Sequence, residues 1–473
     1  MKTVLHWFRR DLRILDNAAL SEAARRAETV IPVFIFEDAF RTGPEVGAAR
    51  LAFRLQSVES LRRHLAELGC MLVIRCGKSE EILPQLCKET GAQAVFASKC
   101  YEPSAWRRDE RVTGILNAAG FGFELFKDAV VWEEMEILTQ AGKPYTIFTP
   151  YSKAWKSKPI PPPKGRLKAS NLQPRTPNIP CDTLPATKDA IGFPLTQAIP
   201  TAGERAALEL LRKFMAGPVY EYGANRNFPA LDGTSRLSPH LSAGTIGIRT
   251  ILAELKKAKE KVESGKRKAE MLANCDIFLN ELIWREFYSQ VLHNFPHVTQ
   301  GAFRPEYDKL EWSENKEHFS AWCEGKTGYP IVDAAMRCLN ATGMMHNRLR
   351  MIVAMFLTKD LLISWQWGER HFMKQLVDGD LAANNGGWQW SAGTGTDAAP
   401  YFRIFNPVSQ GEKFDPKGEF VRRWIPELKN FPGDLIHQPW KNPPLLDKSK
   451  YPPRFVLHEQ QREKCLAMFK AVK

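Results

Sequence analysis

Residues 378–403 read DGDLAANNGGWQWSAGTGTDAAPYFR, a stretch that combines two acids, an amide pair, several glycines and two tryptophans. Large aromatic side chains beside glycines are typical of a site where the backbone must approach a flat ligand closely. On a helix Trp388 and Trp390 would point about 200° apart, so one can face a buried ligand and the other a surface cleft. A tight, glycine-rich junction inside a core is equally compatible with this composition.

The first 130 residues alternate short β-branched or aromatic runs with amphipathic helical patterns. Strict alternation of strand and helix predicts an α/β domain with a doubly wound parallel sheet of Rossmann-like type. No GxGxxG follows the first apolar run, so the usual dinucleotide fingerprint is absent. The expected strands are Val4–Phe8, Val30–Phe36, Met71–Cys76, Ala94–Ala97 and Glu124–Phe126, and the expected helices lie around 17–28, 48–68, 79–90 and 104–119.

Residues 159–200 hold ten of the 32 prolines. Because proline disrupts both helices and central strands, this segment is predicted to be a long surface connector. Beyond it, apolar residues recur at helical spacing, which predicts a mainly α second domain. The expected division is an α/β domain at 1–130, a connector at 131–200 and a helical domain at 201–473. The expected helices of the last part include Glu204–Phe214, Cys275–Phe295, Ile331–Leu339, His346–Leu357 and Arg370–Leu376.

Composition sets broad limits on the class of protein. The 473 residues suffice for two or three domains, and no apolar run approaches the ~20 residues of a membrane span. The nine cysteines include no CxxC pair, which favours reduced thiols in an intracellular protein. A net charge of +13 is compatible with nucleic-acid binding and equally with a solvated basic surface. The basic run at 256–268 is interpreted as an exposed helix and loop, with a DNA-contacting arm as the alternative.

Two predicted helices each bring chemically active side chains to one face. Glu281, Trp284 and Tyr288 are spaced three and four apart, so a carboxyl group would lie beside two aromatic rings. A buried Glu281 would be costly without a hydrogen-bond partner. Core packing explains the aromatic pair equally well.

Asn347, Arg350 and Met351 share a face in the same way, although a solvated surface stripe would show the same spacing. The turn at 233–238, GTSRLS, is rich in hydroxyl groups and backbone donors and leads toward a helix. Such a turn can hold a phosphate or simply cap the helix that follows, and capping is the commoner use.

Seven motifs, spread in order over the whole chain, resemble those of the DNA photolyase/cryptochrome family, and most closely the bacterial class I cyclobutane pyrimidine dimer photolyases. One such match could arise by chance, but seven in series could not. The resemblance implies an α/β domain followed by a large all-α FAD-binding domain. The motifs are HWFRRDLRILDN at 6–17, GTSRLSPHLSAG at 233–244, NELIWREFY at 280–288, KTGYPIVDAAMR at 326–337, GMMHNRLRM at 343–351, DGDLAANNGGWQW at 378–390 and YFRIFNPVSQGEKFD at 401–415.

The resemblance implies one non-covalent FAD, folded into a U shape and active in its reduced form. Asp378 and Asp380 would flank the flavin ring, with Arg350 paired to Asp378 because a buried acid needs a cation. The amide of Asn384 would lie against flavin N5. The implied cofactor contacts are Tyr222, Thr234, Ser235, Arg236, Leu237, Ser238, Arg350, Asp378, Gly379, Asp380 and Asn384.

The implied substrate is DNA with a cyclobutane pyrimidine dimer, and photolyases are among the enzymes known to extrude their target bases from the duplex. Trp284 and Trp390 would stack on the dimer, which replaces the lost base stacking. A protonated Glu281, favoured by the apolar setting expected around it, could donate a hydrogen bond as charge develops on the thymine carbonyl. The implied catalytic residues are Glu281, Asn347, Met351 and Asn384. The implied lesion and DNA contacts are Arg226, Glu281, Trp284, Arg285, Tyr288, Asn347, Arg348, Met351, Trp390 and Gln410.

The implied reaction is light-driven electron transfer that splits the dimer and then returns the electron. Trp388, Trp365 and Trp312 match the family's tryptophan wire, which reduces oxidised flavin from the surface; without the resemblance Trp365 and Trp312 would be interpreted as core residues. A (6-4) photolyase would be expected to carry His in place of Asn347. The sequence also leaves open a cryptochrome-type photoreceptor and a flavoprotein without a DNA role.

A second, light-harvesting chromophore is common in the family. In pterin-binding relatives an Asn-Glu pair occupies the positions of Ser104 and Ala105, and a deazaflavin-binding relative carries Lys near the position of Ser242. The sequence therefore leaves the antenna open: pterin, deazaflavin or none. The resemblance further implies a bacterial cytoplasmic protein that associates with the nucleoid when bound to damage, a monomer, no metal ion and no membrane association.

Overall fold

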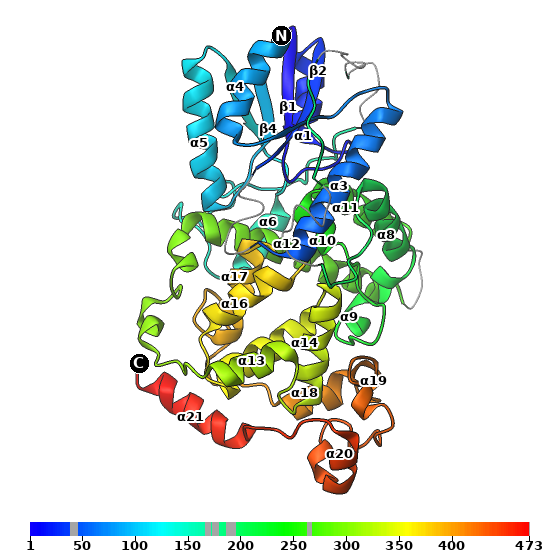
Figure 1. The fold of residues 1–473 in the computed structure, drawn as a ribbon, viewed down its shortest axis with the longest axis vertical. Helices are drawn as coiled ribbons and strands as arrows, with labels where there is room; N and C mark the ends of the chain where they lie inside the picture. Colours follow the sequence, from blue (N-terminus) through cyan, green and yellow to red (C-terminus); the bar gives the residue numbers. More distant parts are fainter. Residues whose placement is uncertain (38–45, 166–171, 173–178, 186–194, 263–266, 473) are drawn as a thin grey trace.

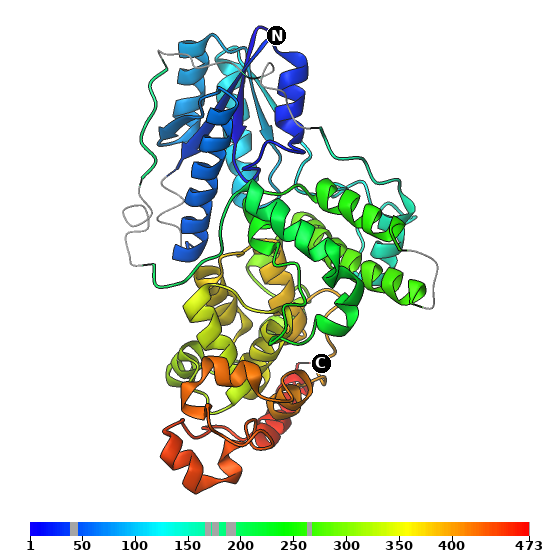
Figure 2. The same ribbon diagram turned by 90° about the vertical axis from the view of Figure 1, so that its right-hand side faces the viewer.

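A computed structural model describes residues 1–37, 46–165, 172, 179–185, 195–262 and 267–472. Figure 1 shows an α/β part that contains the N-terminus and a larger helical part below it. In the quarter-turn view of Figure 2, the C-terminal helices again lie at the end of the molecule away from the sheet. No helix in the described part of the chain is both long and apolar enough to span a lipid bilayer.

A five-stranded parallel sheet forms the centre of the α/β part, in the order β3-β2-β1-β4-β5. Strand β1 pairs on both sides and is buried along its whole length, which explains why most of its residues are apolar. One face of the sheet packs on α1 and α3 and the other on α4 and α5. The strands are β1 (Thr3–Phe8), β2 (Thr29–Phe36), β3 (Val73–Cys76), β4 (Ala94–Ser98) and β5 (Gly122–Phe126), and the helices are α1 (Ala18–Arg26), α3 (Ala48–Glu67), α4 (Ser79–Thr90) and α5 (Pro103–Ala118). The predicted α/β class and parallel sheet are confirmed.

The helical part is built around α12, a helix of 27 residues. Its helices are α6 (Phe148–Ser157), α8 (Glu204–Ala216), α9 (Tyr222–Asn225), α10 (Ser238–Ala243), α11 (Ile248–Glu260), α12 (Lys268–Asn294), α13 (Lys316–Glu324), α14 (Pro330–Thr342), α15 (Asn347–Met355), α16 (Trp365–Gln375), α17 (Leu381–Ala392), α18 (Pro407–Phe414), α19 (Glu419–Trp424), α20 (Pro443–Ser449) and α21 (His458–Lys470). Short turns of helix are η2 (Pro218–Glu221), η3 (Pro296–Thr299), η4 (Pro305–Lys309), η6 (Pro426–Leu428) and η7 (Pro439–Lys441), and η5 (Phe356–Asp360) is a π-helical turn.

The segment expected to be a connector contains a helix near its start. Trp155 on α6 donates its indole N–H to the buried carboxylate of Glu286 on α12, at 2.6 Å. Glu286 also accepts the backbone N–H groups of Val131 and Trp132. The first part of residues 131–200 is therefore fixed against α12. The expected surface path of 166–171, 173–178 and 186–194 lies outside the described residues.

Four buried charges join the two parts. Arg249 on α11 contacts Asp16 at 2.8 Å and Asp128 at 2.9 Å, and Arg13 contacts Asp128 at 2.7 Å. Nearby, Gly244 packs directly against the backbone of Arg10. A side chain at this position would not fit, because a Cβ would lie 1.7 Å from the carbonyl oxygen of Arg10, and the φ of +71° also favours glycine. These contacts hold the first βα loop of the sheet against α10 and α11.

Candidate functional site

Helix α17 is the centre of the candidate site. Its N-terminus is capped by Asp380, whose Oδ1 accepts the backbone N–H of Ala383 at 3.1 Å, and it ends at Gly393 in a left-handed conformation. Trp388 is 2% exposed, whereas Trp390 is only partly buried. The two indoles therefore have different surroundings, as their helical spacing predicts.

The two acids before α17 have different partners. Asp378 is paired with Arg350 at 2.7 Å through Oδ2, as expected from the resemblance, and its buried Oδ1 has no partner among the described residues. Asp380 instead points toward the α/β part, where its Oδ2 contacts Arg10 at 2.6 Å and Arg10 also pairs with Glu102. Asp378 thus keeps one oxygen for a ligand. The two carboxylate oxygens of Asp380, expected to flank the flavin, are engaged elsewhere.

Asn384 offers a defined acceptor on the first turn of α17. Its side-chain N–H donates to the carbonyl oxygen of Glu369 at 3.0 Å, so its amide oxygen points away from that contact. A Cβ added at Gly386 would clash with the Tyr288 ring at 2.1 Å, whereas one at Gly387 would meet nothing within 4 Å. A free carboxylate oxygen, an outward amide oxygen and open space beside a glycine suit a flat ring with N–H edges. The residues present therefore fit a flavin.

The turn before α10 has the geometry of a helix entry. Leu237 is buried and Ser238 begins α10 without a side-chain cap, so its first N–H groups are open. Arg236 has φ +52° and pairs with Asp232 at 2.9 Å on the exposed side. Tyr222 is 8% exposed, and the Arg226 guanidinium lies 5.4 Å from its ring centroid. Thr234 and Ser235 are partly buried beside this turn.

Helix α12 brings Glu281, Trp284 and Tyr288 together, as their spacing predicts. The Trp284 ring stacks on Phe148 with centroids 3.7 Å apart and planes 6° from parallel, and the Tyr288 ring lies at 5.4 Å. Sequence reasoning assigned no role to Phe148, because nothing local links it to α12. It begins α6, and its N–H donates to Asp397 at 3.0 Å, which fixes its position.

Two expectations for α12 need correction. Glu281 is not in an apolar setting: it is ion-paired with Arg226 at 2.6 Å, and its side chain is 27% exposed. Arg285, expected to contact DNA, donates to the carbonyl oxygen of Ala129 at 2.7 Å. Arg285 points toward the α/β part because a helix turns its adjacent residues about 100° apart, so it cannot share the face of Trp284.

The remaining expected DNA contacts lie around the start of α15. Asn347 is its first residue and is exposed, and Met351 is partly buried one turn later. Arg348 donates to Asn227 at 2.8 Å and lies over the Phe414 ring at 4.4 Å. Gln410 is partly exposed on α18, the helix that ends in Phe414. Asn347, Arg348 and Gln410 are therefore all at least partly accessible to solvent.

The expected tryptophan wire begins in the core. The Trp388 ring lies 5.0 Å from Phe372 and 6.1 Å from Trp322, and it packs so closely on Gly368 that a Cβ there would lie 2.1 Å from the indole. Trp365 is 3% exposed at the start of α16. Trp312 is partly exposed and lies 6.4 Å from the Phe469 ring.

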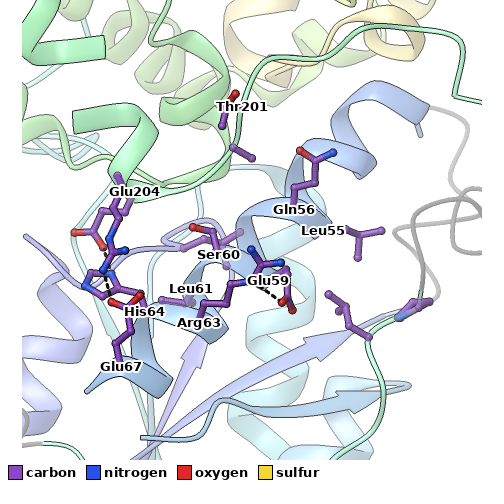
Figure 3. Close-up of a pocket in the computed structure, with 15 residues that line it drawn as sticks. Leu55, Gln56, Glu59, Ser60, Leu61, Arg63, His64, Glu67, Thr201 and Glu204 are labelled. Carbon is purple, nitrogen blue, oxygen red and sulfur yellow. Dashed lines mark hydrogen bonds and ion pairs between the residues drawn. The ribbon is translucent and has the colours of Figure 1, made fainter. Parts of the chain in front are cut away.

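A separate cavity of about 550 Å³ lies between α3 and the start of α8 (Figure 3). Polar side chains of its lining contact one another: Arg63 pairs with Glu59, and the His64 ring lies against the Glu204 carboxylate. No residue expected to bind FAD or DNA lines it. A smaller hollow of about 50 Å³ at the junction of the two parts is lined by Arg10, Arg285 and Asp380, among others.

Comparisons with known protein families define the class. Residues 278–471 match a family model described as the FAD binding domain of DNA photolyase, and residues 4–166 match the model described as DNA photolyase. The chain is therefore a two-domain FAD-binding protein.

Individual relatives match this chain over nearly their full length. The chain is 41% identical to the deoxyribodipyrimidine photo-lyase of Escherichia coli and 40% identical to that of Vibrio cholerae, covering at least 99% of each protein and of itself. It is similar to a class III photolyase of Agrobacterium tumefaciens, with a TM-score of 0.88 at 36% identity over 100% of this chain and 98% of that one. It is also similar to a Sulfolobus tokodaii photolyase with two FAD molecules, with a TM-score of 0.84 at 31% identity over 99% of this chain and 100% of that one. The chain belongs to the DNA photolyase/cryptochrome family.

Proposed function

We propose that this chain is a light-dependent DNA repair enzyme that splits cyclobutane pyrimidine dimers. The observation that supports this most directly is the fixed orientation of Asn384, whose N–H is bound to Glu369 so that its amide oxygen is free. The relatives named deoxyribodipyrimidine photo-lyase add support for the substrate class. In this proposal residues 1–130 form the α/β domain, residues 131–200 connect the domains, and residues 201–473 bind FAD and DNA.

The cofactor would be held by the residues around α17. Asp378, fixed by Arg350, would present its unpartnered Oδ1 to an N–H edge of the flavin, and the amide oxygen of Asn384 would accept a hydrogen bond from the reduced ring. The turn from Thr234 to Ser238 would receive the diphosphate, with Tyr222 beside it. When bound and reduced, the flavin supplies a light-excited electron for cleavage of the dimer.

The chain's own side chains would receive the extruded dimer. Trp284, backed by Phe148, and the partly exposed Trp390 offer apolar rings to the two bases. Asn347 and Glu281 would hydrogen-bond the base edges. The phosphates on either side would meet Arg348 and, after it leaves Glu281, Arg226. Exchange of that ion pair would let the Glu281 carboxylate take up a proton from water, and the resulting O–H group would donate to the thymine carbonyl.

The test is repair of defined oligonucleotides under blue light by the FAD-loaded, chemically reduced protein. Thymine-dimer DNA is expected to be restored, and DNA with a (6-4) photoproduct is expected to stay unchanged, because Asn347 stands where a (6-4) enzyme is expected to have His. A protein that takes up FAD but restores neither lesion would overturn the proposal and favour a photoreceptor. Repair of the (6-4) lesion alone would show that the protein is a (6-4) photolyase instead.

Substitution of Glu281 tests the proposed exchange of partners. Glu281→Ala is expected to lower the repair yield at saturating dimer DNA while FAD stays bound, because the donor to the thymine carbonyl is lost. Arg226→Gln is the matched control: it is expected to weaken DNA binding without lowering the yield once DNA saturates. If Glu281→Ala repairs with the unaltered yield, the donor role is wrong.

A further inference from the structure

Glu286 joins α12 to α6, the helix whose first residue backs Trp284. Its side chain is 3% exposed, and its oxygens accept hydrogen bonds from three groups that can only donate. Oε2 accepts the backbone N–H of Val131 at 2.6 Å, and Oε1 accepts the backbone N–H of Trp132 at 2.9 Å and the indole N–H of Trp155 at 2.6 Å. Such a set of partners suits an ionised carboxylate, which carries no proton of its own.

The bond from Trp155 to Glu286 is one of two anchors of α6. Phe148 and Trp155 are seven residues apart, so they share a face of the helix and lie about 10 Å apart along its axis. At the first anchor the Phe148 N–H donates to Asp397 at 3.0 Å, and the Phe148 ring stacks on Trp284 at 3.7 Å. Two anchors fix the direction of a helix, so Glu286 helps to keep the two stacked rings parallel.

The other polar contacts between α6 and α12 lie at an accessible edge. Ser152 and Lys156 both reach Oδ1 of Asn280, at 3.3 and 2.7 Å. Lys156 is exposed and Asn280 is only partly buried, so water competes for the bond between them. The buried carboxylate of Glu286 is an anchor that water cannot replace in this way.

Two opposing effects set the charge of Glu286. Burial raises its pKa, whereas its three hydrogen-bond donors and the guanidinium of Arg285 lower it, and the balance is a pKa of about 7. The titratable group that faces it from α6 is the hydroxyl of Tyr151, whose pKa is raised by burial and by the Glu286 carboxylate, so that this hydroxyl keeps its proton. Residues 131 and 132 face Glu286 with backbone N–H groups. Both charge states of Glu286 are therefore populated near neutral pH.

Protonation would change what Glu286 can hold. A carboxyl group with a proton from water has one O–H donor, which cannot bond to another donor. It would have to release the N–H of Val131 or of Trp155, or turn toward the hydroxyl oxygen of Tyr151. Each of these movements weakens the second anchor, and α6 could then swing about its contact with Asp397.

We propose that Glu286 is a positioning residue whose ionised carboxylate holds α6, so that Phe148 keeps Trp284 in place for a base, and whose protonated form releases α6. This inference rests on the proposed function, which brings the dimer to Trp284. The preference for dimer DNA should therefore be full above about pH 8 and should decline as the pH falls toward about 6.

The experiment measures the preference of the FAD-loaded protein in the dark, as the ratio of the dissociation constants for undamaged and thymine-dimer duplexes. Phosphate contacts are common to both duplexes, so their own pH dependence cancels in the ratio. In the unaltered protein the ratio is expected to fall several-fold between about pH 8.5 and about pH 6. Glu286→Gln resembles the protonated form, since its amide also brings a donor, and is expected to show the low ratio at every pH.

Trp155→Phe distinguishes a titrating anchor from simple packing. It keeps a ring but removes one donor that stabilises the ionised form of Glu286, so the midpoint of the pH profile should move to higher pH. Trp322→Phe is the matched control: Trp322 is also buried, but its indole N–H donates to the carbonyl oxygen of Val353 at 3.1 Å, a group that does not titrate. Its midpoint is expected to equal that of the unaltered protein.

Infrared difference spectra report the charge of Glu286 directly. A carboxylic acid band is expected to grow as the pH falls through about 7 and to be missing from Glu286→Gln. If the unaltered protein lacks this band, if its ratio stays constant with pH, or if the midpoint of Trp155→Phe is unshifted, the inference is wrong. If the band titrates as expected but dimer and undamaged DNA bind equally at every pH, the proposed function is wrong, and the role in lesion recognition falls with it.

Discussion

At the scale of single residues, the contact between Phe148 and Trp284 gives the proposed lesion site one fixed wall. An indole has two faces, and Phe148 covers one of them in a nearly parallel stack at 3.7 Å. Phe148 is itself tied to the segment after α17 through its N–H bond to Asp397. A base can therefore meet Trp284 only on the opposite face, and the ring cannot tilt without breaking the stack.

Loss of this stack is expected to weaken recognition of the lesion. Phe148→Ala should raise the dissociation constant for thymine-dimer DNA by several-fold to about tenfold, because an aromatic pair is worth ~0.5–1.5 kcal/mol beyond its buried area. Phe148→Tyr keeps the ring and should bind as the unaltered protein does. The measurement is a binding titration in the dark with damaged and undamaged DNA. Tighter binding by Phe148→Ala would show that Phe148 occupies the face that the lesion needs.

Individual ion pairs could be predicted from the sequence only where both partners belong to motifs that resemble those of the family. The Arg350–Asp378 pair follows from the resemblance and is present in the structure. The pairing of Glu281 with Arg226 was not predicted, because helical periodicity describes the face of α12 and says nothing of a cation from another helix. The roles proposed for these residues remain predictions.

At the scale of elements, the end of α15 is a feature that the spacing of apolar residues does not predict. The apolar spacing predicts one helix over His346–Leu357, but α15 ends at Met355 and continues as the π-turn η5. The turn buries two charged residues: Lys359 donates to the carbonyl oxygen of Ala392 at 2.6 Å, and Asp360 contacts His458 at 2.6 Å. These partners lie on α17 and α21, so no local pattern could indicate them.

The C-terminal helix α21 is held against η5 and Trp312 by one ring. Phe469 is 0% exposed and lies 3.8 Å from the Lys359 ammonium, 5.6 Å from Tyr401 and 6.4 Å from Trp312. Phe469→Ala is expected to lower the free energy of unfolding by about 3–5 kcal/mol through the cavity it leaves. The check is the urea midpoint, with Phe469→Leu losing less. A change below ~1 kcal/mol would mean that α21 is not part of the cooperative unit.

At the scale of the whole molecule, the two domains differ in how far sequence alone could describe them. The α/β domain follows from alternation of strand and helix, because period and turn signals are local. The order of the strands and the packing of the two domains depend on contacts between distant residues. The buried set of Arg13, Asp16, Asp128 and Arg249 is one example: each residue by itself has the sequence signature of a surface charge.

Removal of Arg249 is expected to uncouple the domains. Arg249→Met leaves Asp16 and Asp128 buried with less compensation, which should cost about 3–5 kcal/mol. Arg249→Lys should recover only part of this, because a single ammonium cannot contact both acids as the guanidinium does. The measurement is urea unfolding followed by tryptophan fluorescence and circular dichroism. Two separated transitions are expected for Arg249→Met, and one unshifted transition would refute the coupling.

The same substitution is expected to change how stability depends on pH. Burial by itself would raise the pKa of Asp128, but the guanidinium groups of Arg13 and Arg249 outweigh it and hold that pKa below the usual range of a carboxyl group. A carboxyl group with a lowered pKa in the folded state stabilises the protein at pH values above its unfolded pKa, and this contribution is lost as the pH falls toward the folded pKa. The unaltered protein should therefore lose stability between about pH 5 and pH 3 more steeply than Arg249→Met, which retains only Arg13 beside Asp128. Urea midpoints at about pH 7, 5, 4 and 3 measure this difference, and parallel losses in both proteins would show that Arg249 does not set the charge state of Asp128.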